Sequence, residues 1–424
     1  MNQLYKAHGY VTAMALLTQQ EIRDGTVRIL LIEGRVGQVR LENNRSTHDD
    51  YLLERIDLPA GQVPNLNELD RQLQWFNGTN DAKLAIQLEA GKEPGTTDFS
   101  IIANEPDQHQ FTLMSDSAGR RDIGNIRAGV GYTNASLTGR RDSLGIVTLF
   151  SRSSQIALLQ YSLPVNRRGT RLAAYYNGNR MKVTDGDLEH FKVKGRADYF
   201  GLTLSHPIFV EMRFKQDLTL DVQRQDSSTE VLGVEFVDDR EYRLSLGTGL
   251  TWHGVGEVYY FKPTYIHGWY RGLAEKKDVG RLKADFIWQK QDSRENLYSV
   301  TVAAQKALSH YLPSSDQFYL GGMYSVRGYR ESVLSADSGL AANFEFRFPV
   351  KSLNSSVLFF YDAGRLFGKN TLSTRTLTSV GFGIHSTFFK GSELTLTVGF
   401  PKKDKILDER VNDWRVHFGL NIRL

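Results

Sequence analysis

The stretch WRVHFGLNIRL, residues 414–424, alternates large apolar side chains with polar, basic or small ones. Successive side chains of a strand point to opposite faces, so this alternation predicts a strand with one apolar and one polar face. The apolar face comprises Trp414, Val416, Phe418, Leu420, Ile422 and Leu424, and the other face Arg415, His417, Gly419, Asn421 and Arg423. A strand of a transmembrane β-barrel and a half-buried strand of a soluble protein share this pattern. How often the pattern recurs along the chain decides between these two classes of protein.

The alternation recurs from about residue 108 to the end of the chain, and aromatic residues often close the apolar rows, as in the girdles of membrane barrels. A membrane strand needs roughly 9–11 residues, and the last 317 residues accommodate roughly 16 strands with their connections. A soluble propeller or β-helix would also alternate, but the chain has no repeat of fixed period. The pattern therefore favours a transmembrane antiparallel barrel of about 16 strands. Further instances are 242–252, 282–289, 298–305, 340–348, 380–388 and 393–400.

Composition narrows the possible functions of the 424 residues. The chain has no cysteine, which excludes disulfides, thiolate metal sites and cysteine nucleophiles. A net charge of only +4 does not favour a nucleic-acid partner. The ten histidines have no metal-binding spacing, and no HExxH or GxSxG motif is present. The sequence thus predicts a protein that is not an enzyme and uses neither a metal nor a cofactor.

Residues 1–107 predict small α+β units rather than barrel strands. Strands are expected at 10–17, 26–34 and 36–43, and again at 82–91 and 96–104. Between them, Ser46 or Thr47 is placed to cap a helix ending at Arg55, and Asn65 to cap one through Trp75. From residue 36 the order is strand–helix–helix–strand–strand. The part before it looks like the end of a similar unit whose start is missing, which suggests a truncated chain.

Two further stretches invite a pairing hypothesis. GGMYSVRGYRE, residues 321–331, places Arg327 in a glycine-rich loop, where the backbone can pass close to another surface. LFFYDAGRLF, residues 358–367, places Asp362 within an otherwise apolar strand. A guanidinium binds a carboxylate through two parallel hydrogen bonds, so the pair can hold the loop in one position. The alternative is that Arg327 is a solvated loop charge and Asp362 faces a polar lumen alone.

The first of these stretches resembles the tip of the sixth extracellular loop in the outer-membrane transporters of two-partner secretion, the TpsB family. Val326, Arg327, Gly328 and Tyr329 match the family's Val-Arg-Gly-Tyr/Phe motif. The family's partner motif, an aromatic followed by an Asp and a Gly on a later strand, is matched by Phe359, Asp362 and Gly364. The resemblance implies that the loop, near 310–336, folds into the pore. It also implies that Arg327 contacts Asp362 on the inner wall.

The resemblance covers nearly the whole chain. Residues 27–43 look like the junction between two POTRA domains, and residues 61–77 like the helical part of the second. It implies three units: 1–35, the C-terminal remnant of a first POTRA domain; 36–107, a second POTRA domain; and 108–424, the barrel. At the end of the chain, Gly419, Ile422 and Leu424 are similar to the signal that the barrel-assembly machinery reads. Leu424 stands where the family usually has Phe.

The resemblance also implies location, partners and function. The barrel would lie in the lipids of a Gram-negative outer membrane, as a monomer, with the POTRA domains in the periplasm. These domains would recognise the N-terminal secretion domain of a large exoprotein of the haemolysin, adhesin or contact-dependent-inhibition kind, and the barrel would translocate it. The alternative is a barrel-assembly factor, which inserts other outer-membrane proteins and carries more POTRA domains. A passive porin is a further alternative, but it lacks a periplasmic unit such as residues 1–107.

Overall fold

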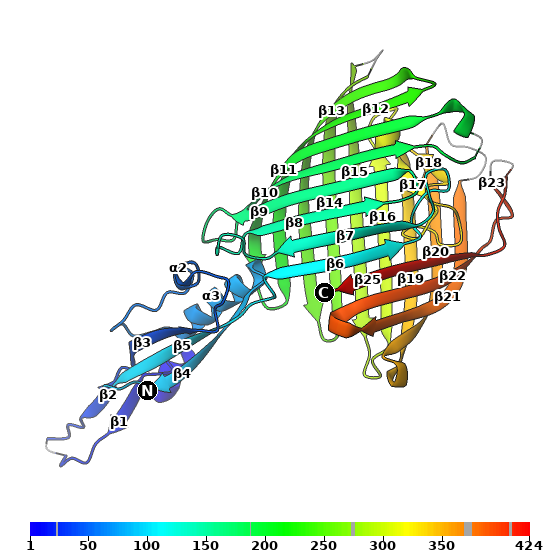
Figure 1. Ribbon diagram of the computed structural model, residues 1–424. Helices are drawn as coiled ribbons and strands as arrows, with labels where there is room; N and C mark the ends of the chain where they lie inside the picture. Colours follow the sequence, from blue (N-terminus) through cyan, green and yellow to red (C-terminus); the bar gives the residue numbers. More distant parts are fainter. Residues whose placement is uncertain (23, 187, 273–275, 369–374, 407–408) are drawn as a thin grey trace.

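The computed structural model describes residues 1–22, 24–186, 188–272, 276–368, 375–406 and 409–424. It has two parts: an α+β module that carries the N-terminus and a large β-barrel that carries the C-terminus (Figure 1). Among the described residues, no helix is both long and apolar enough to cross a membrane.

The chain begins with a short helix and a hairpin. Helix α1 (Asn2–Ala7) is followed by strands β1 (Met14–Leu17) and β2 (Ile29–Ile32), which pair antiparallel. The hairpin is shorter than the predicted strands, and most of its apolar side chains are exposed, among them Leu30 and Leu31. The backbone N–H of Leu66 donates to the carbonyl of Gly9 at 2.8 Å and so ties this part to the next.

The following unit has the predicted order of strand, two helices and two strands. Its sheet has the order β3-β5-β4, with β3 parallel and β4 antiparallel to the central β5. The two helices pack on this sheet through one hydrophobic core that includes Leu52, Phe76 and Phe99. The elements are β3 (Arg35–Glu42), α2 (Asp49–Leu53), α3 (Leu66–Thr79), β4 (Lys83–Ala90) and β5 (Thr96–Asn104).

One of the two predicted helix caps is correct. The Asn65 side chain accepts hydrogen bonds from the backbone N–H groups of residues 67 and 68 and caps α3. The prediction for α2 is wrong, because its N-cap residue is His48 and no side chain caps it. Instead, the Ser46 hydroxyl donates to Glu105 at 2.7 Å, and Thr47 lies against the guanidinium of Arg141.

In the described part of the chain, sixteen antiparallel strands form a closed barrel, which confirms the predicted fold class. The last strand, β25, pairs with the first, β6, so that every strand has two neighbours and no edge faces lipid. The strands are β6 (His109–Asp116), β7 (Arg127–Asn134), β8 (Ser143–Phe150), β9 (Ser154–Pro164), β10 (Arg171–Lys182), β11 (Lys194–Val210), β12 (Phe214–Val231), β13 (Val234–Gly254), β14 (Glu257–Arg271), β15 (Lys276–Gln291), β16 (Leu297–Ala307), β19 (Ser338–Val350), β20 (Ser355–Phe367), β21 (Thr376–Phe388), β22 (Ser392–Pro401) and β25 (Arg415–Arg423).

Short elements occur in the connections between barrel strands. Three are single 3₁₀ turns, and two form a small hairpin before the last strand. They are η1 (Glu189–Phe191), η3 (Lys351–Leu353), η4 (Phe389–Gly391), β23 (Lys405–Ile406) and β24 (Glu409–Arg410).

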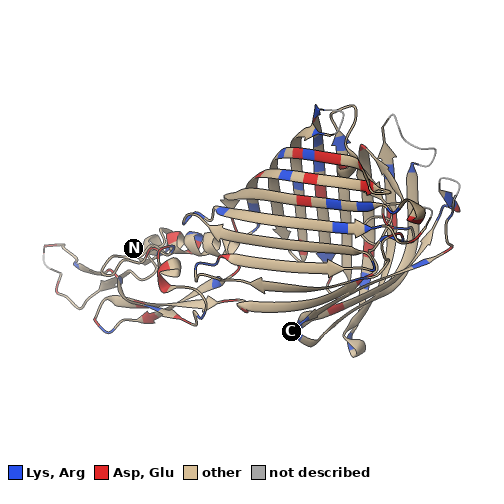
Figure 2. Ribbon diagram, turned by 45° about the horizontal axis from the view of Figure 1, so that its top comes forward, with Lys and Arg blue, Asp and Glu red and all other residues tan. Residues whose placement is uncertain are grey.

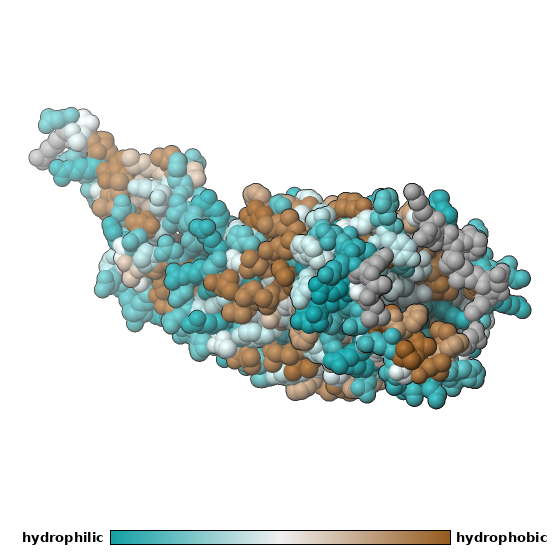
Figure 3. Space-filling view, turned by 90° about the horizontal axis from the view of Figure 1, so that it is seen from above, coloured by the Kyte–Doolittle hydropathy of each residue, from teal (hydrophilic) through white to brown (hydrophobic). Residues whose placement is uncertain are grey.

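The outer face of the barrel is apolar and carries an aromatic girdle. On β13 the outward Tyr242 is 46% exposed, whereas the inward Glu241 is 2% exposed. Ring contacts link aromatic residues of successive strands at one level of the wall, as predicted from the ends of the apolar rows. Apolar side chains cover much of the wall in Figure 3. The linked pairs include Phe214–Trp252, Tyr259–Trp288 and Tyr298–Phe346.

Strands β11, β12 and β13 are longer than a membrane crossing requires. They contain 17, 18 and 21 residues, whereas roughly 9–11 are enough to cross. Their ends far from the module carry charges of both signs (Figure 2). There Asp226 accepts hydrogen bonds from Arg224 and Arg240, each at 2.7 Å. These ends therefore extend beyond the apolar band of the wall.

Candidate functional site

The candidate site is the loop between β16 and β19, which folds back into the barrel. It contains the turn η2 (Ser314–Asp316) and the paired short strands β17 (Phe318–Leu320) and β18 (Leu334–Ala336). In Figure 1 these strands lie among the barrel strands, at the end away from the module. We call residues 308–337 the pore loop. Its apolar side chains, Leu320, Val326, Tyr329 and Leu334, pack against Ala341, Leu366 and Leu377 of the wall.

The tip of the pore loop turns sharply at its glycines. Gly321 and Gly322 have φ values of 98° and 107°, a region that favours glycine, and the Gly322 N–H donates to the carbonyl of Val326 at 3.2 Å. At Gly328 the tip approaches the backbone of Gly399 on β22. A Cβ atom added to Gly399 would lie 2.6 Å from the Gly328 nitrogen. Two glycines are therefore needed for loop and wall to come this close.

The structure places Arg327 against Asp362 on the inner wall. Arg327 Nε donates to Asp362 Oδ2 at 2.8 Å, and Nη2 donates to Oδ1 at 2.9 Å. The backbone N–H of Arg327 also donates to Oδ2, at 3.0 Å. The Asp362 side chain is fully buried and accepts all three bonds. Bidentate geometry with a charged partner is the strong form of this interaction.

A second wall carboxylate completes the charge balance. Arg327 Nη1 donates to Glu345 Oε2 at 2.7 Å, and Glu345 in turn accepts from Arg347 at 2.6 Å. Two cations thus face two anions. Burial lowers the pKa of Arg327, but the hydrogen bonds and charge of Asp362 and the charge of Glu345 outweigh it and raise this pKa. We call the contact of Arg327 with Asp362 and Glu345 the tip anchor.

The aromatic residue of the tip anchor is Phe360, not the predicted Phe359. The guanidinium of Arg327 lies 3.5 Å from the centroid of the Phe360 ring, which is 4% exposed. Phe359 is 48% exposed and faces outward. The reason is the period of two along a strand: residues 360 and 364 share the inner face with Asp362, whereas 359 lies on the outer face.

The other predicted motif residues also lie at this contact. Gly364 leaves room for the loop, because a Cβ added there would lie 2.5 Å from Leu320 and 3.1 Å from the fully buried Val326. The Tyr329 hydroxyl donates to the carbonyl of Thr378 at 3.0 Å and accepts from the Lys403 N–H at 3.1 Å.

His417 is a further residue of the site, besides Glu345 and Phe360, that the sequence did not predict. His417 Nε2 on β25 accepts a hydrogen bond from the Gly328 N–H at 3.0 Å, and the side chain is 2% exposed. The available signal was its place on the polar face of 414–424, which it shares with four other residues.

The predicted assembly signal lies on the same last strand. Gly419 faces the lumen, where a Cβ would meet Met323 of the loop at 3.0 Å, and Leu424 is 56% exposed.

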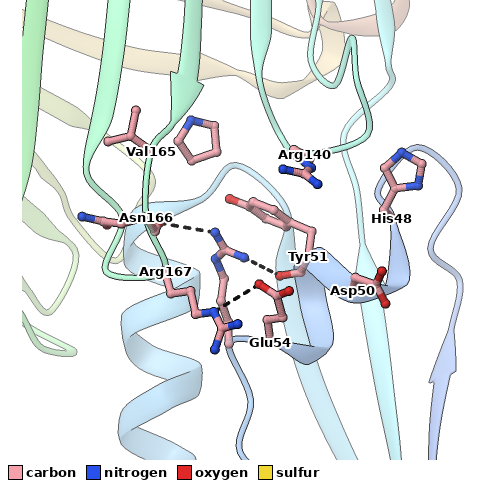
Figure 4. A pocket seen from close by; sticks show the side chains of 10 residues that line it. His48, Asp50, Tyr51, Glu54, Arg140, Val165, Asn166 and Arg167 are labelled. Atoms are coloured by element: carbon pink, nitrogen blue, oxygen red, sulfur yellow. Dashed lines mark hydrogen bonds and ion pairs between the residues drawn. The ribbon is translucent and has the colours of Figure 1, made fainter.

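The module meets the barrel at a polar junction. Arg141, in the connection between β7 and β8, is 1% exposed and forms a bidentate ion pair with Asp81 of the module. Beside it lies a cleft of about 400 Å³ between α2 and the turn after β9. Figure 4 shows Arg167 of that turn reaching Glu54 of the module, at 3.1 Å. These contacts fix the module beneath the barrel wall.

Comparison with known proteins assigns this architecture to a family. A family model described as haemolysin secretion/activation protein ShlB/FhaC/HecB matches residues 95–386, more than half of the chain. The chain belongs to this family. A second model, the POTRA domain of ShlB type, matches residues 1–34. The resemblance to the transporters of two-partner secretion is thereby confirmed.

Individual relatives of the haemolysin secretion/activation family are similar over most of their length. The heme/hemopexin transporter protein HuxB of Haemophilus influenzae is 25% identical over 96% of this chain and 77% of that protein. The outer membrane transporter CdiB of Dickeya dadantii is 23% identical over 94% of this chain and 74% of that protein. These relatives are named as transporters.

Solved structures share the fold. CdiB from Escherichia coli superposes with a TM-score of 0.78 at 19% identity, over 100% of this chain and 83% of that one. BamA from Haemophilus ducreyi, solved without POTRA domains 1–3, gives a TM-score of 0.64 at 14% identity, over 100% and 92%. The barrel-assembly alternative is therefore the weaker one. The chain is an outer-membrane protein of two-partner secretion, with its barrel in the membrane and its POTRA region in the periplasm, and it translocates a partner exoprotein.

Proposed function

We propose that the pore loop is the movable element of the translocation pore and that the tip anchor holds it in the docked position. The observation that carries this proposal is the set of three hydrogen bonds from Arg327 to the fully buried Asp362. Removing one partner of a buried ion pair costs roughly 3–5 kcal/mol, which is enough to keep the loop docked at rest. The contact is not covalent, so a passing chain can displace it and the loop can return.

We further propose that residues 1–35 belong to a first POTRA domain and 36–107 form a second, which recognises the N-terminal secretion domain of the exoprotein. An exposed sheet edge can add a strand from an extended chain through main-chain hydrogen bonds. At the start of β4, the Asn77 side chain bonds both the N–H and the carbonyl of Leu84, so these groups point away from β5. By the period of two, the same groups of Ile86 and Leu88 also point outward.

The edge of β4 is therefore the better candidate for strand addition. Leu88 is 41% exposed, and in the described part of the chain its outward backbone groups have no partner. The outer edge of β3 is occupied at Val36, whose N–H and carbonyl bond Gln62 and Gly61.

Substitution of Leu88 tests this edge. Leu88→Pro removes the outward N–H and no bond to β5, and proline is tolerated at strand edges. We expect it to abolish capture of the exoprotein's N-terminal domain by the full chain in a pull-down. Leu88→Ala, which keeps the N–H, should retain it. Equal binding by both variants would rule out strand addition at β4.

Secretion tests the tip anchor. Cells carrying Arg327→Ala should retain the exoprotein encoded beside this chain in the periplasm, while the barrel remains folded by heat-modifiable gel mobility. The matched control is Arg365→Ala, which removes the same side chain from the exposed face of β20. Unchanged secretion in Arg327→Ala would refute the role of the anchor. Normal secretion combined with defects in other outer-membrane proteins would favour a barrel-assembly factor.

We propose two further properties on the ground of the family resemblance. Gly419, Ile422 and Leu424 form the signal that the barrel-assembly machinery reads, since they end the strand that closes the barrel on β6. The transporter acts as a monomer, because a closed barrel leaves no edge strand for pairing with a second copy.

A further inference from the structure

The pore loop contacts the wall at a second place, far from its tip along the chain. Asp316, in the turn η2, has a side chain with no exposure at all. Its two carboxylate oxygens accept from Arg243 on β13 and Arg281 on β15. Arg243 also donates to Glu241 at 2.7 Å and to Gln223 at 3.1 Å. Two arginines therefore face two carboxylates in the lumen, one of which belongs to the loop.

A glycine of the barrel wall, Gly268, leaves space for this contact. Strand β14 separates the two arginine-bearing strands, and Arg243 lies opposite Gly268 of β14. A Cβ at Gly268 would lie 2.2 Å from the Glu241 carboxylate and 3.0 Å from Val279. The missing side chain leaves the space in which Glu241 and the two arginines converge on Asp316.

The first and last parts of the pore loop are both bound by the side chain of Gln305. Gln305 on β16 is 4% exposed, and its Nε2 donates to the carbonyl of Asp316 at 2.7 Å and to that of Asp337 at 3.0 Å. Asp337 Oδ1 in turn accepts from the backbone N–H of Leu312 at 3.3 Å. The start and end of the loop are thus joined to one side chain of the wall.

We propose that Asp316, with Arg243 and Arg281, is the fixed pivot of the pore loop: the tip swings during translocation while this base anchor stays closed. The two anchors use different wall strands, β13 and β15 for the base and β19 and β20 for the tip. The tip anchor can therefore open while the base anchor stays closed. If Asp316 left, two buried arginines would face one carboxylate, and such an unbalanced buried charge is strongly disfavoured. Asp316 is on this view a positioning residue, and the inference rests on the proposed mobility of the tip.

Spin labels on single cysteines test the pivot, because the chain has no cysteine of its own. One label replaces Tyr324 at the tip, which is 71% exposed, and the other replaces the exposed Ser315 beside the base anchor. Each is read by electron paramagnetic resonance in the full-length barrel carrying Arg327→Ala or Asp316→Asn. Arg281→Gln serves as a second base variant in case Asp316→Asn does not fold.

We expect Arg327→Ala to convert the immobile spectrum at 324 into a mobile one and to leave the spectrum at 315 unchanged. Asp316→Asn and Arg281→Gln should mobilise the label at 315. The control is Asp221→Asn, which removes a lumenal carboxylate that bonds only wall residues, Tyr175 and Thr203, among the described contacts. It should change neither label.

The outcomes separate this inference from the proposed function. If the label at 315 also becomes mobile in Arg327→Ala, or stays immobile in both base variants, the pivot is refuted while the tip anchor stands. If the label at 324 stays immobile in Arg327→Ala, the proposed tip anchor fails, and the pivot that rests on it fails too.

Discussion

The tip anchor and the base anchor hold the pore loop by the same chemistry with the charges exchanged. At the tip the loop supplies a cation, Arg327, to the carboxylates of Asp362 and Glu345. At the base it supplies an anion, Asp316, to two arginines of the wall. Neither part of the loop can satisfy the other wall site, because like charges would then be buried together. Opposite polarity therefore fixes which segment of the loop docks where.

The two anchors also differ in how closely the backbone approaches the wall. At the tip, the Gly328 N–H bonds His417, and two glycines permit backbone contact. At the base, long side chains span the distance, and Gln305 bonds two loop carbonyls. The tip thus depends on small residues in a short motif, whereas the base depends on residues of three strands, β13, β15 and β16.

The largest expected effect is loss of both anchors at once. Asp362→Ala leaves Arg327 without its bidentate partner, at a cost of roughly 3–5 kcal/mol to the docked loop. Adding Asp316→Asn should raise the conductance of the barrel in planar bilayers well above that of either single variant. If the anchors are independent, their effects on the free energy of docking add in a double-mutant cycle.

Non-additive coupling between Asp362→Ala and Asp316→Asn would show that the two anchors open together. Asp221→Asn again serves as the control for a change of lumenal charge. It should leave the conductance unchanged, because its partners are Tyr175 and Thr203 of the wall.

An intermediate effect is expected from the aromatic residue beneath Arg327. Phe360→Leu removes a cation–π contact worth roughly 0.5–2 kcal/mol and should partly mobilise a spin label at 324. Phe359→Leu is the matched control, one residue away on the outer face, and should leave that label immobile. The reverse result would restore Phe359 to the inner-wall motif.

A further effect concerns pH and distinguishes the tip from the base. Burial raises the pKa of Glu331 to about 7, and the negative charge of Asp116 adds to this rise. The hydrogen bond from the Met323 N–H and the charges of Arg127 and Arg415 act in the opposite direction and lower the pKa. A raised carboxyl pKa means that docking is strongest when Glu331 is protonated. The tip should therefore loosen as pH rises from the ordinary glutamate pKa of 4.5 to about 7, by about 1.4 kcal/mol for each unit of the pKa difference, and change little above that pH.

Spin-label spectra between pH 5 and 8 check this dependence. The mobile fraction at 324 should rise with pH, and Glu331→Gln should remove the change. The label at 315 should not respond, since Glu331 is not part of the base anchor. A falling mobile fraction at 324 would contradict the direction of the shift.

Much of the fold could be predicted from local patterns. The alternation in 414–424 and in its equivalents predicted the strands and their apolar faces, and the length of the region predicted about sixteen of them. Asn65 predicted the start of α3. These features depend on the period of two along a strand and on hydrogen bonds between residues close in sequence, which can be read without coordinates.

The candidate site was only partly predictable. The glycine-rich motif at 321–331 and the isolated Asp362 suggested a contact because each is unusual in its own stretch. Phe359 and Phe360 both precede Asp362, and only the period of two along the strand places Phe360 on its face. Nothing in the local sequence distinguishes Asp316 from the other acids of the chain.

The sequence by itself therefore determined the closed barrel, its two faces and the residue pair worth testing. Only the tertiary structure decided that Asp316, Arg243 and Arg281 meet, that His417 bonds the tip, and that β4 is an edge strand of its sheet. The physical reason is that closure of the barrel and the register of its strands bring together residues tens to hundreds of positions apart. Charges on separate strands are placed against one another only when every intervening strand is in register.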